Sequence, residues 1–121
     1  MNRKVLLVEN HDSLRHLIGV FLSREFEVTG ARNGLEAMCR LSNGLRPDVI
    51  VTDAKMPDLN GSQLLANLRC SGMFSDIPVI VIGSAENEEE EQHFKQLGAH
   101  DYFSKPFSPV KLQDRLMQIM G

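Results

Sequence analysis

Short apolar runs and amphipathic segments alternate along the whole chain. The apolar runs predict buried strands near residues 4–8, 26–30, 48–52, 77–82 and 100–103. Apolar residues at helical spacing predict helices near 12–24, 34–43, 61–71, 86–97 and 108–120. Alternation of this kind is typical of an α/β protein whose parallel sheet is covered by helices on both faces. The pattern alone leaves the order of the strands open.

Three of the predicted helices carry apolar residues at every third or fourth position, which we expect to face the sheet. The three stripes consist of Leu14, Leu17, Ile18, Phe21 and Leu22; of Leu64, Leu65 and Leu68; and of Leu112, Leu116, Ile119 and Met120. The acidic run 88–91, in contrast, predicts the solvated first turn of the fourth helix, where carboxylates favour the positive end of the helix dipole.

Length and composition predict one domain, residues 1–121, with a single core. The chain is 42% hydrophobic and 24% charged, which is ordinary for a globular protein. Its net charge of −3 gives no basic surface, so we expect no direct binding of nucleic acid. No apolar stretch reaches membrane-spanning length, and no leader peptide opens the chain. Cys39 and Cys70 both lie in helical patterns, which disfavours a disulfide or a zinc site and indicates the reducing cytoplasm.

Asp53 is the most informative single residue, because it ends the buried apolar run 49–52. Pro57 and Gly61 then mark a loop before the next helix. Open parallel sheets place their ligand chemistry at the carboxyl ends of strands, so Asp53 is a candidate phosphoryl acceptor, metal ligand or both. Taken alone, its position favours the simpler role of capping the following turn.

Two other strand ends change this balance. The first predicted strand is followed by Glu9 and Asn10, and the last leads into Lys105. If the strands are parallel and adjacent, all of these groups lie at one edge of the sheet. Such a set can hold a divalent cation with an ammonium group beside it, which is what phosphoryl transfer needs.

The order and spacing of these segments resemble the receiver domain of bacterial two-component response regulators, the CheY-like superfamily. The resemblance covers essentially the whole chain. It is carried by Val8–Asn10, Pro47–Asp53, Met56–Pro57 with Gly61, Pro78–Ile82, Gly98–Ala99 and Tyr102–Phe107. It implies a flavodoxin-like, doubly wound (βα)5 fold with a five-stranded parallel sheet in the order 2-1-3-4-5. It also implies a cis peptide bond between Lys105 and Pro106.

The resemblance assigns roles to individual residues. It implies that Asp53 is the phosphorylated residue and that Lys105 acts with it in catalysis by pairing with the phosphoryl oxygens. Mg²⁺ is the implied cofactor, with near-octahedral oxygen ligands. The implied metal ligands are Glu9, Asn10, Asp53 and the backbone carbonyl of Lys55.

Asn10 departs from the family's pattern. It stands where receivers carry the acid that touches the metal directly, so one negative charge is missing from the predicted metal site. An amide oxygen can still bind Mg²⁺, but we expect the lost charge to weaken metal binding by about 1–2 kcal/mol.

Gly83 is the second departure. It stands where receivers carry a threonine or serine whose hydroxyl bonds the phosphoryl group and couples phosphorylation to a change of shape. Ser84 could supply that hydroxyl only if the loop is shifted. Tyr102 aligns with the aromatic residue that moves with this hydroxyl. Alternatively, Tyr102 is a half-buried strand tyrosine whose hydroxyl stays in water.

Two hypotheses for function follow. The first is a phosphoacceptor receiver, a signalling module rather than a metabolic enzyme. It would take a phosphoryl group from a sensor histidine kinase or phosphotransfer protein onto Asp53, promote its own phosphorylation and dephosphorylation, and switch an interaction surface on its fourth helix, fifth strand and fifth helix. The alternative, to which Asn10 and Gly83 point, is a phosphorylation-weak pseudo-receiver that acts as a constitutive protein-binding module.

A homodimer through the same surface is a further hypothesis. Glu91 and Lys111 are opposite in charge, as are Asp101 and Arg115, so each pair could bridge two subunits around a twofold axis. The simpler interpretation is that these residues are independent surface charges or pairs within one chain.

A third class, a flavodoxin-like domain that binds a nucleotide or flavin, is disfavoured. The loop 9–13 contains no glycine that would let a phosphate approach the backbone. His11 lies in this loop and could approach an incoming phosphoryl group. Loop histidines are more often only solvated, so we assign it no role here.

Overall fold

The computed structural model describes residues 3–84 and 87–121, and within them five strands form one parallel sheet. The strands are β1 (Lys4–Val8), β2 (Glu27–Ala31), β3 (Val49–Asp53), β4 (Val79–Gly83) and β5 (Asp101–Ser104). The helices are α1 (Asp12–Leu22), α2 (Gly34–Ser42), α3 (Gly61–Cys70), α4 (Glu88–Gln96) and α5 (Pro109–Met120). The strand order is β2-β1-β3-β4-β5. The α/β fold and the strand order implied by the resemblance are therefore confirmed.

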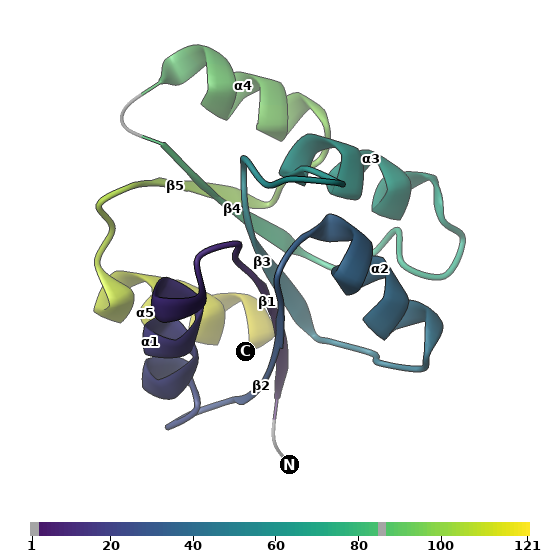
Figure 1. Ribbon diagram of the computed structural model, residues 1–121. Helices are drawn as coiled ribbons and strands as arrows, with labels where there is room; N and C mark the ends of the chain where they lie inside the picture. The colour runs from purple at the N-terminus through teal and green to yellow at the C-terminus, as the bar shows by residue number, and fades with distance from the viewer. Residues whose placement is uncertain (1–2, 85–86) are drawn as a thin grey trace.

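The sheet lies between two layers of helices, with α1 and α5 on one face and α2, α3 and α4 on the other (Figure 1). Successive side chains of β1 point to opposite layers. Leu6 and Val8 join the core beneath α2, α3 and α4, whereas Val5 and Leu7 join the core beneath α1 and α5. Strands β3 and β4 are buried at every position, as expected for central strands covered on both faces.

The predicted helix stripes face the sheet, with one correction. The α3 stripe is fully buried, and in α1 Ile18 and Leu22 are buried. Leu17, however, is 68% exposed, so its assignment to the buried stripe of α1 was wrong. The core contact of α1 follows a row of residues four apart, and Leu17 lies one residue off that row. It lines an apolar hollow on the surface together with Phe107 and Pro109.

The boundaries of the elements differ from expectation by at most two residues at either end, and two differences matter for the site. Asp53 is the last residue of β3 rather than the residue after it, because it pairs in register with Ile82 of β4. Gly83 likewise ends β4, in register with Ser104 of β5. Both residues are therefore fixed by the sheet ladder rather than by a loop.

The carboxyl ends of three strands meet at one edge of the sheet. Val8 of β1 is in register with Thr52 of β3, which brings Glu9 beside Asp53. At the end of β5, the backbone N–H of Lys105 donates to the carbonyl of Gly83 at 2.9 Å. The peptide bond from Lys105 to Pro106 is cis, as the resemblance implied.

The loop after β3 folds back closely against the strand end. The N–H of Gly61 donates to the carbonyl of Ala54 at 3.1 Å. A Cβ atom added to Gly61 would lie 2.5 Å from the backbone carbonyl oxygen of Asp53, which cannot rotate away. Asn60 caps α3 through the N–H of Gln63. Gly61 thus allows the helix to start directly behind the candidate acceptor.

We expect Gly61→Ala to lower the free energy of unfolding by about 1–3 kcal/mol, because the added methyl group overpacks a rigid backbone contact. Urea denaturation measures this change. Gly19→Ala is the matched control, since no atom lies within 4 Å of a Cβ placed at this position inside α1. The control should raise stability by about 0.5–1 kcal/mol through helix propensity. A Gly61→Ala chain as stable as the wild type would contradict the described packing of the loop.

Candidate functional site

One ammonium group and two buried carboxylates form the centre of the site. The Nζ atom of Lys105 lies 3.1 Å from Oδ1 of Asp53 and 3.3 Å from Oε1 of Glu9. Asp53 is 6% exposed and Glu9 only 2%. The three residues that the sequence placed at separate strand ends are therefore in direct contact in the structure.

Each carboxylate is held in place by a backbone N–H. Oδ1 of Asp53 accepts from the N–H of Ala54 at 3.1 Å. Oε2 of Glu9 accepts from the N–H of His11 at 2.9 Å. Among the described residues, the hydrogen bonds and ion pairs of Asp53 involve Oδ1 and leave Oδ2 without a partner.

The environment shifts the pKa values of Asp53 and Glu9 in opposite directions. Burial, with the charge of Glu9 as a second cause, raises the pKa of Asp53 from 3.8 to about 6 despite the opposing effect of Lys105. Burial also opposes ionisation of Glu9, but the hydrogen bond from the His11 backbone and the charge of Lys105 outweigh it and lower the pKa. At neutral pH both are ionised, and Asp53 is the more basic carboxylate of the pair.

Lys105 stays firmly protonated in this position. Burial works against its charge, but the hydrogen bond and charge of Asp53, followed by those of Glu9, raise its pKa above the ordinary value. One positive and two negative charges leave the centre with a net charge of −1. A phosphoryl group entering here would add more negative charge, so the chemistry calls for a further cation.

The atoms that could bind that cation come from Glu9, His11 and Asp53. One potential ligand atom from each lies within 4.8 Å of the others. Two carboxylates fit a divalent ion that keeps several of its waters, as Mg²⁺ does. Asn10 is exposed, and Lys55 lies exposed two residues beyond Asp53 in the loop after β3.

The residues predicted to form the switch lie one strand away. Gly83 is buried and Ser84 is exposed. A Cβ atom on Gly83 would lie 1.7 Å from the hydroxyl oxygen of Tyr102 and 2.5 Å from Oε1 of Glu90. The phenol of Tyr102 therefore occupies the space in which a side chain at position 83 would begin.

Tyr102 is held in that space by α4. It is 8% exposed, and its hydroxyl donates to Oε1 of Glu90 at 2.6 Å. Its ring packs against Phe94 with 6.2 Å between the ring centroids. Burial and the Glu90 carboxylate raise the pKa of the phenol well above its ordinary value. The alternative of a strand tyrosine with its hydroxyl in water is therefore wrong.

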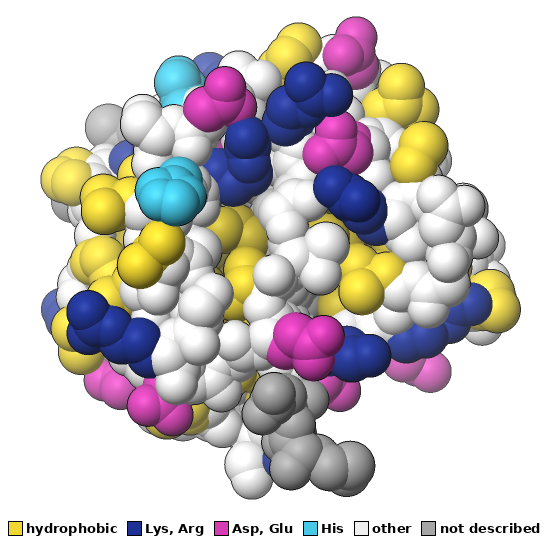
Figure 2. Space-filling model, turned by 60° about the horizontal axis from the view of Figure 1, so that its bottom comes forward, with side chains coloured by type: hydrophobic (Ala, Val, Ile, Leu, Met, Phe, Trp, Pro, Cys, Tyr) yellow, Lys and Arg dark blue, Asp and Glu magenta, His cyan; other side chains and the backbone are white. Residues whose placement is uncertain are grey.

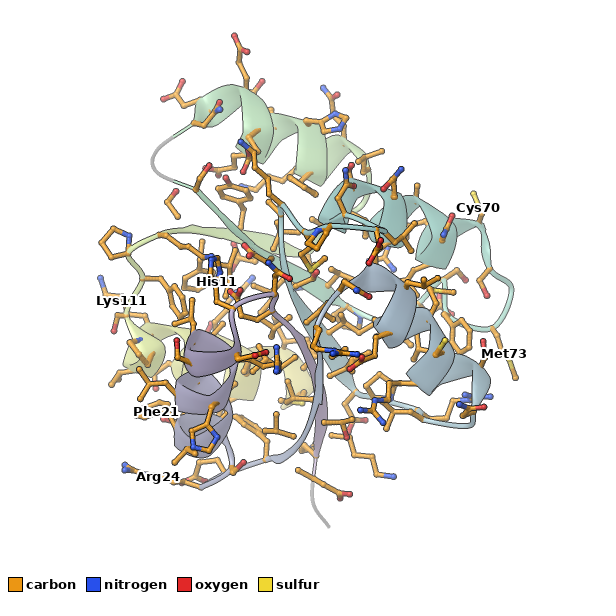
Figure 3. All side chains as sticks on the ribbon, in the orientation of Figure 1. His11, Phe21, Arg24, Cys70, Met73 and Lys111 are labelled. Carbon is orange, nitrogen blue, oxygen red and sulfur yellow. The ribbon has the colours of Figure 1, made fainter. Side chains whose placement is uncertain are left out.

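Three of the four surface charges considered for a dimer have partners within the chain. Arg115 lies 2.7 Å from Asp101, and Lys95 lies 3.0 Å from Glu91. Lys111 is exposed at the start of α5 (Figure 3). The homodimer remains a hypothesis, and these intrachain pairs would have to break or be shared for it to form.

Sequence reasoning left two residues of this region without a role, His11 and Glu90. In the sequence, only the position of His11 directly after Glu9 and Asn10 pointed to the site. In the structure its ring Nδ1 lies 3.2 Å from Oε2 of Glu9. Glu90 belongs to an acidic run that looks uniformly solvated in sequence. Its contact with Tyr102 joins residues twelve positions apart and depends on the packing of α4 over β5.

A sequence model of the response regulator receiver domain matches residues 5–117. The chain belongs to the response regulator receiver domain family. Chemotaxis protein CheY1 of Helicobacter pylori is 32% identical over 120 residues, which cover 98% of this receiver and 97% of that protein. Transcriptional regulatory protein KdpE of Staphylococcus aureus is 33% identical over 120 residues, but the match spans only 50% of its length. Hybrid signal transduction histidine kinase D of Dictyostelium discoideum is 32% identical over 116 residues, which are 7% of its length.

Solved structures agree with this assignment. The receiver domain of the Francisella response regulator 1452 superimposes with a TM-score of 0.90 at 31% identity, covering 98% of this chain and 97% of that one. The phosphorylated cyanobacterial phytochrome response regulator RcpA gives a TM-score of 0.83 at 29% identity, covering 98% of this chain and 91% of that one. None of the helices within the described ranges combines the length and hydropathy needed for a membrane span. The chain is thus a receiver domain of two-component signalling, a signalling module rather than a metabolic enzyme.

The raised pKa of Asp53 predicts a pH-dependent cost of folding. The folded chain binds this proton more tightly than the unfolded chain, so ionised Asp53 destabilises the fold above about pH 6, and the cost disappears as the pH falls toward 3.8. In metal-free buffer at neutral pH, Asp53→Asn should therefore raise the free energy of unfolding by on the order of 2 kcal/mol. This gain in the free energy of unfolding should shrink as the pH falls from about 6 toward 3.8.

Denaturant titration of both chains across this pH range is the measurement, with a chelator present. Asp114→Asn serves as the control, because Asp114 is exposed on α5 and should change stability little. An Asp53→Asn chain that is less stable than the wild type at neutral pH would contradict the electrostatic description of the centre.

Proposed function

We propose that this receiver accepts a phosphoryl group on Asp53. The observation that carries the proposal is a buried, relatively basic carboxylate at a strand end, with a lysine ammonium 3.1 Å from one of its oxygens. A carboxylate oxygen of Asp53 forms a bond to phosphorus as the bond from phosphorus to a histidine nitrogen of the donor breaks. The nitrogen leaves with its electron pair, and Asp53 becomes an acyl phosphate. Attack by water then releases inorganic phosphate and restores the carboxylate.

Lys105 and Glu9 divide the remaining work. Lys105 moves its hydrogen bond from the carboxylate to the phosphoryl oxygens and offsets their charge, for which a point-like ammonium on a flexible chain is suited. Glu9, Asp53, the amide of Asn10 and the backbone carbonyl of Lys55 would hold Mg²⁺. When bound, the ion would offset the charge of the entering phosphoryl group.

The partner that fits this chemistry is a protein carrying a phosphohistidine, either a sensor histidine kinase or a phosphotransfer protein. Receiver domains of two-component signalling imply such a partner. On the face shown in Figure 2, basic and acidic side chains are interspersed rather than gathered by sign. With the net charge of −3, this distribution supports a protein partner over nucleic acid.

Incubation with Mg²⁺ and acetyl phosphate should add one phosphoryl group to the wild-type chain. Intact-mass spectrometry measures the gain, and Asp53→Asn should abolish it because the amide is not a nucleophile here. Asp48→Asn is the matched control on the same strand region, away from the site, and should still be labelled. Labelling of the Asp53→Asn chain would remove Asp53 from its proposed role.

Restoring the missing carboxylate should strengthen metal binding. We expect Asn10→Asp to tighten Mg²⁺ binding by about tenfold through the added Coulomb attraction. The substitution should also destabilise the metal-free fold, because three carboxylates then crowd together. Calorimetric titration of both chains measures the first effect. Equal Mg²⁺ affinities would mean that the side chain at position 10 does not face the ion.

A second candidate function, a constitutive protein-binding module, is favoured by the position of Tyr102. In the family, the hydroxyl at the position of Gly83 couples the phosphoryl group to this aromatic residue. Here Tyr102 already fills the space beside Gly83 and is anchored to Glu90. The surface formed by α4, β5 and α5 would then keep one shape whether or not Asp53 is phosphorylated. Ser84 is exposed beyond the end of β4 and would have to supply the coupling hydroxyl in place of Gly83.

Tyr102 is the only tyrosine, and the chain has no tryptophan, so its absorbance and fluorescence report on this position alone. Alkaline titration of the wild type should show a phenol pKa clearly above its usual value of about 10. Gly83→Ser should displace the ring and bring the titration close to that value, and Glu90→Gln should lower it in part. Glu88→Gln, an exposed residue of the same helix, is the control.

If the surface is constitutive, acetyl phosphate should leave the Tyr102 fluorescence of the wild type unchanged under conditions in which Asp53 is labelled. A fluorescence change that follows labelling would show that Tyr102 still responds to phosphorylation. The phosphoacceptor function would then stand, and the constitutive binding module would be excluded.

A further inference from the structure

His11 is the residue of the site that phosphoryl transfer leaves without a task. It follows Glu9 and Asn10 and is the N-cap residue of α1, yet its side chain caps no backbone group of that helix. Figure 3 shows it over the start of α1, on the loop that joins this helix to β1. The ring Nδ1 lies 3.2 Å from Oε2 of Glu9, and the ring is 69% exposed. The imidazole therefore contacts the carboxylate centre from its solvent side.

Both oxygens of the Glu9 carboxylate contact a neighbouring side chain. Its Oε1 faces Lys105 at 3.3 Å, whereas its Oε2 faces the ring of His11. Oδ2 of Asp53 has no partner in the described residues. The loop itself is fixed, because Arg15 donates to the carbonyl of Glu9 at 2.8 Å and its N–H donates to the carbonyl of His11 at 2.9 Å. One potential ligand atom each from Glu9, His11 and Asp53 therefore lies within 4.8 Å of the other two.

The donor set contains an imidazole nitrogen and two carboxylates, and Asn10 contributes no charge. Mg²⁺ prefers oxygen ligands and gains little from an imidazole. First-row transition ions bind imidazole well, and their affinity for mixed nitrogen and oxygen sites rises from Mn²⁺ through Co²⁺ to Ni²⁺.

We propose that His11 is a metal ligand in this receiver and that it shifts the selectivity of the site from Mg²⁺ toward divalent transition ions such as Co²⁺ and Ni²⁺. The proposal rests on the proposed function in placing a divalent ion beside Asp53. The observation that supports it is the closeness of the His11 ring to the carboxylates of Glu9 and Asp53. Neutral imidazole binds the ion through a ring nitrogen, so no covalent or redox step is involved.

A purely structural role makes a different prediction. If His11 served only to orient Glu9, its ring would matter equally for every ion. Much of that orientation comes from the backbone N–H of His11, which a change of side chain retains. The ratio of affinities for two ions therefore separates the two roles, whereas a single affinity does not.

The test is calorimetric titration of the untagged, metal-free chain with Mg²⁺, Co²⁺ and Ni²⁺ separately. His11→Ala should lower the preference for Co²⁺ over Mg²⁺ by about tenfold or more, the scale on which loss of one ligand acts. His16→Ala, which removes an exposed histidine from α1, should leave the preference unchanged. Co²⁺ absorption gives a second measure, because loss of a nitrogen ligand should shift the visible bands in His11→Ala alone.

An equal loss of affinity for all three ions in His11→Ala would overturn the proposal, as would unchanged Co²⁺ binding and spectrum. These titrations use no phosphodonor. A wild-type chain that shows the His11-dependent preference but takes no label from acetyl phosphate would retain the metal site and lose the proposed function. A chain that takes the phosphoryl label in the presence of Mg²⁺ but shows no His11-dependent preference would keep the proposed function and lose the proposed role of His11.

Discussion

The site depends on two buried carboxylates, those of Glu9 and Asp53, that share the ammonium group of Lys105 at one edge of the sheet. Glu9 and Asp53 are forced together because β1 and β3 are neighbours in register, and both strands are buried on their way to the edge. Lys105 reaches them from the end of β5 and stabilises the pair without neutralising it. Removing Lys105 would leave two buried carboxylates without a counter-charge, whereas neutralising Asp53 relieves the repulsion between the two.

The unbalanced charge also supports the proposed role of Asp53 as acceptor. Because Glu9 holds its proton weakly and Asp53 holds it more tightly, the negative charge least stabilised by the fold resides on the residue proposed as acceptor. A carboxylate of raised basicity is a better nucleophile than an exposed one. The same net negative charge favours a bound cation, so one electrostatic constraint connects the proposed metal site with the proposed acceptor.

The α/β architecture was predictable from periodicity, whereas the strand order that brings the centre together was predicted only through the resemblance to receiver domains. Apolar runs and amphipathic stretches predict the alternating elements, and the parallel sheet then brings Glu9, Asp53 and Lys105 to one edge. The position of Tyr102 was not predictable, because it depends on a side chain that Gly83 lacks and on Glu90 from a helix that looks uniformly solvated. Leu17 was assigned wrongly because a stripe read from spacing is wider than the contact that α1 makes.

The two departures from the family's pattern each lie beside an unusual contact. The missing side chain at Gly83 leaves room for Tyr102, and Asn10 is followed in the chain by His11, whose ring contacts Glu9. In both places a neighbouring side chain with different chemistry occupies or adjoins the position. The receiver fold is thus retained, while the residues proposed for the metal site and the switch differ from the family's usual ones.

The central claim is that burial and Glu9 make Asp53 an unusually basic carboxylate that Lys105 keeps ionised. Carbon-13 NMR of the side-chain carboxyl of Asp53, assigned with Asp53→Asn, tests it directly in metal-free buffer. The account predicts a titration midpoint near pH 6 in the wild type. It also predicts a higher midpoint in Lys105→Met, because the opposing positive charge is then gone. A midpoint near 3.8, the ordinary value, that does not move when Lys105 is replaced would contradict it.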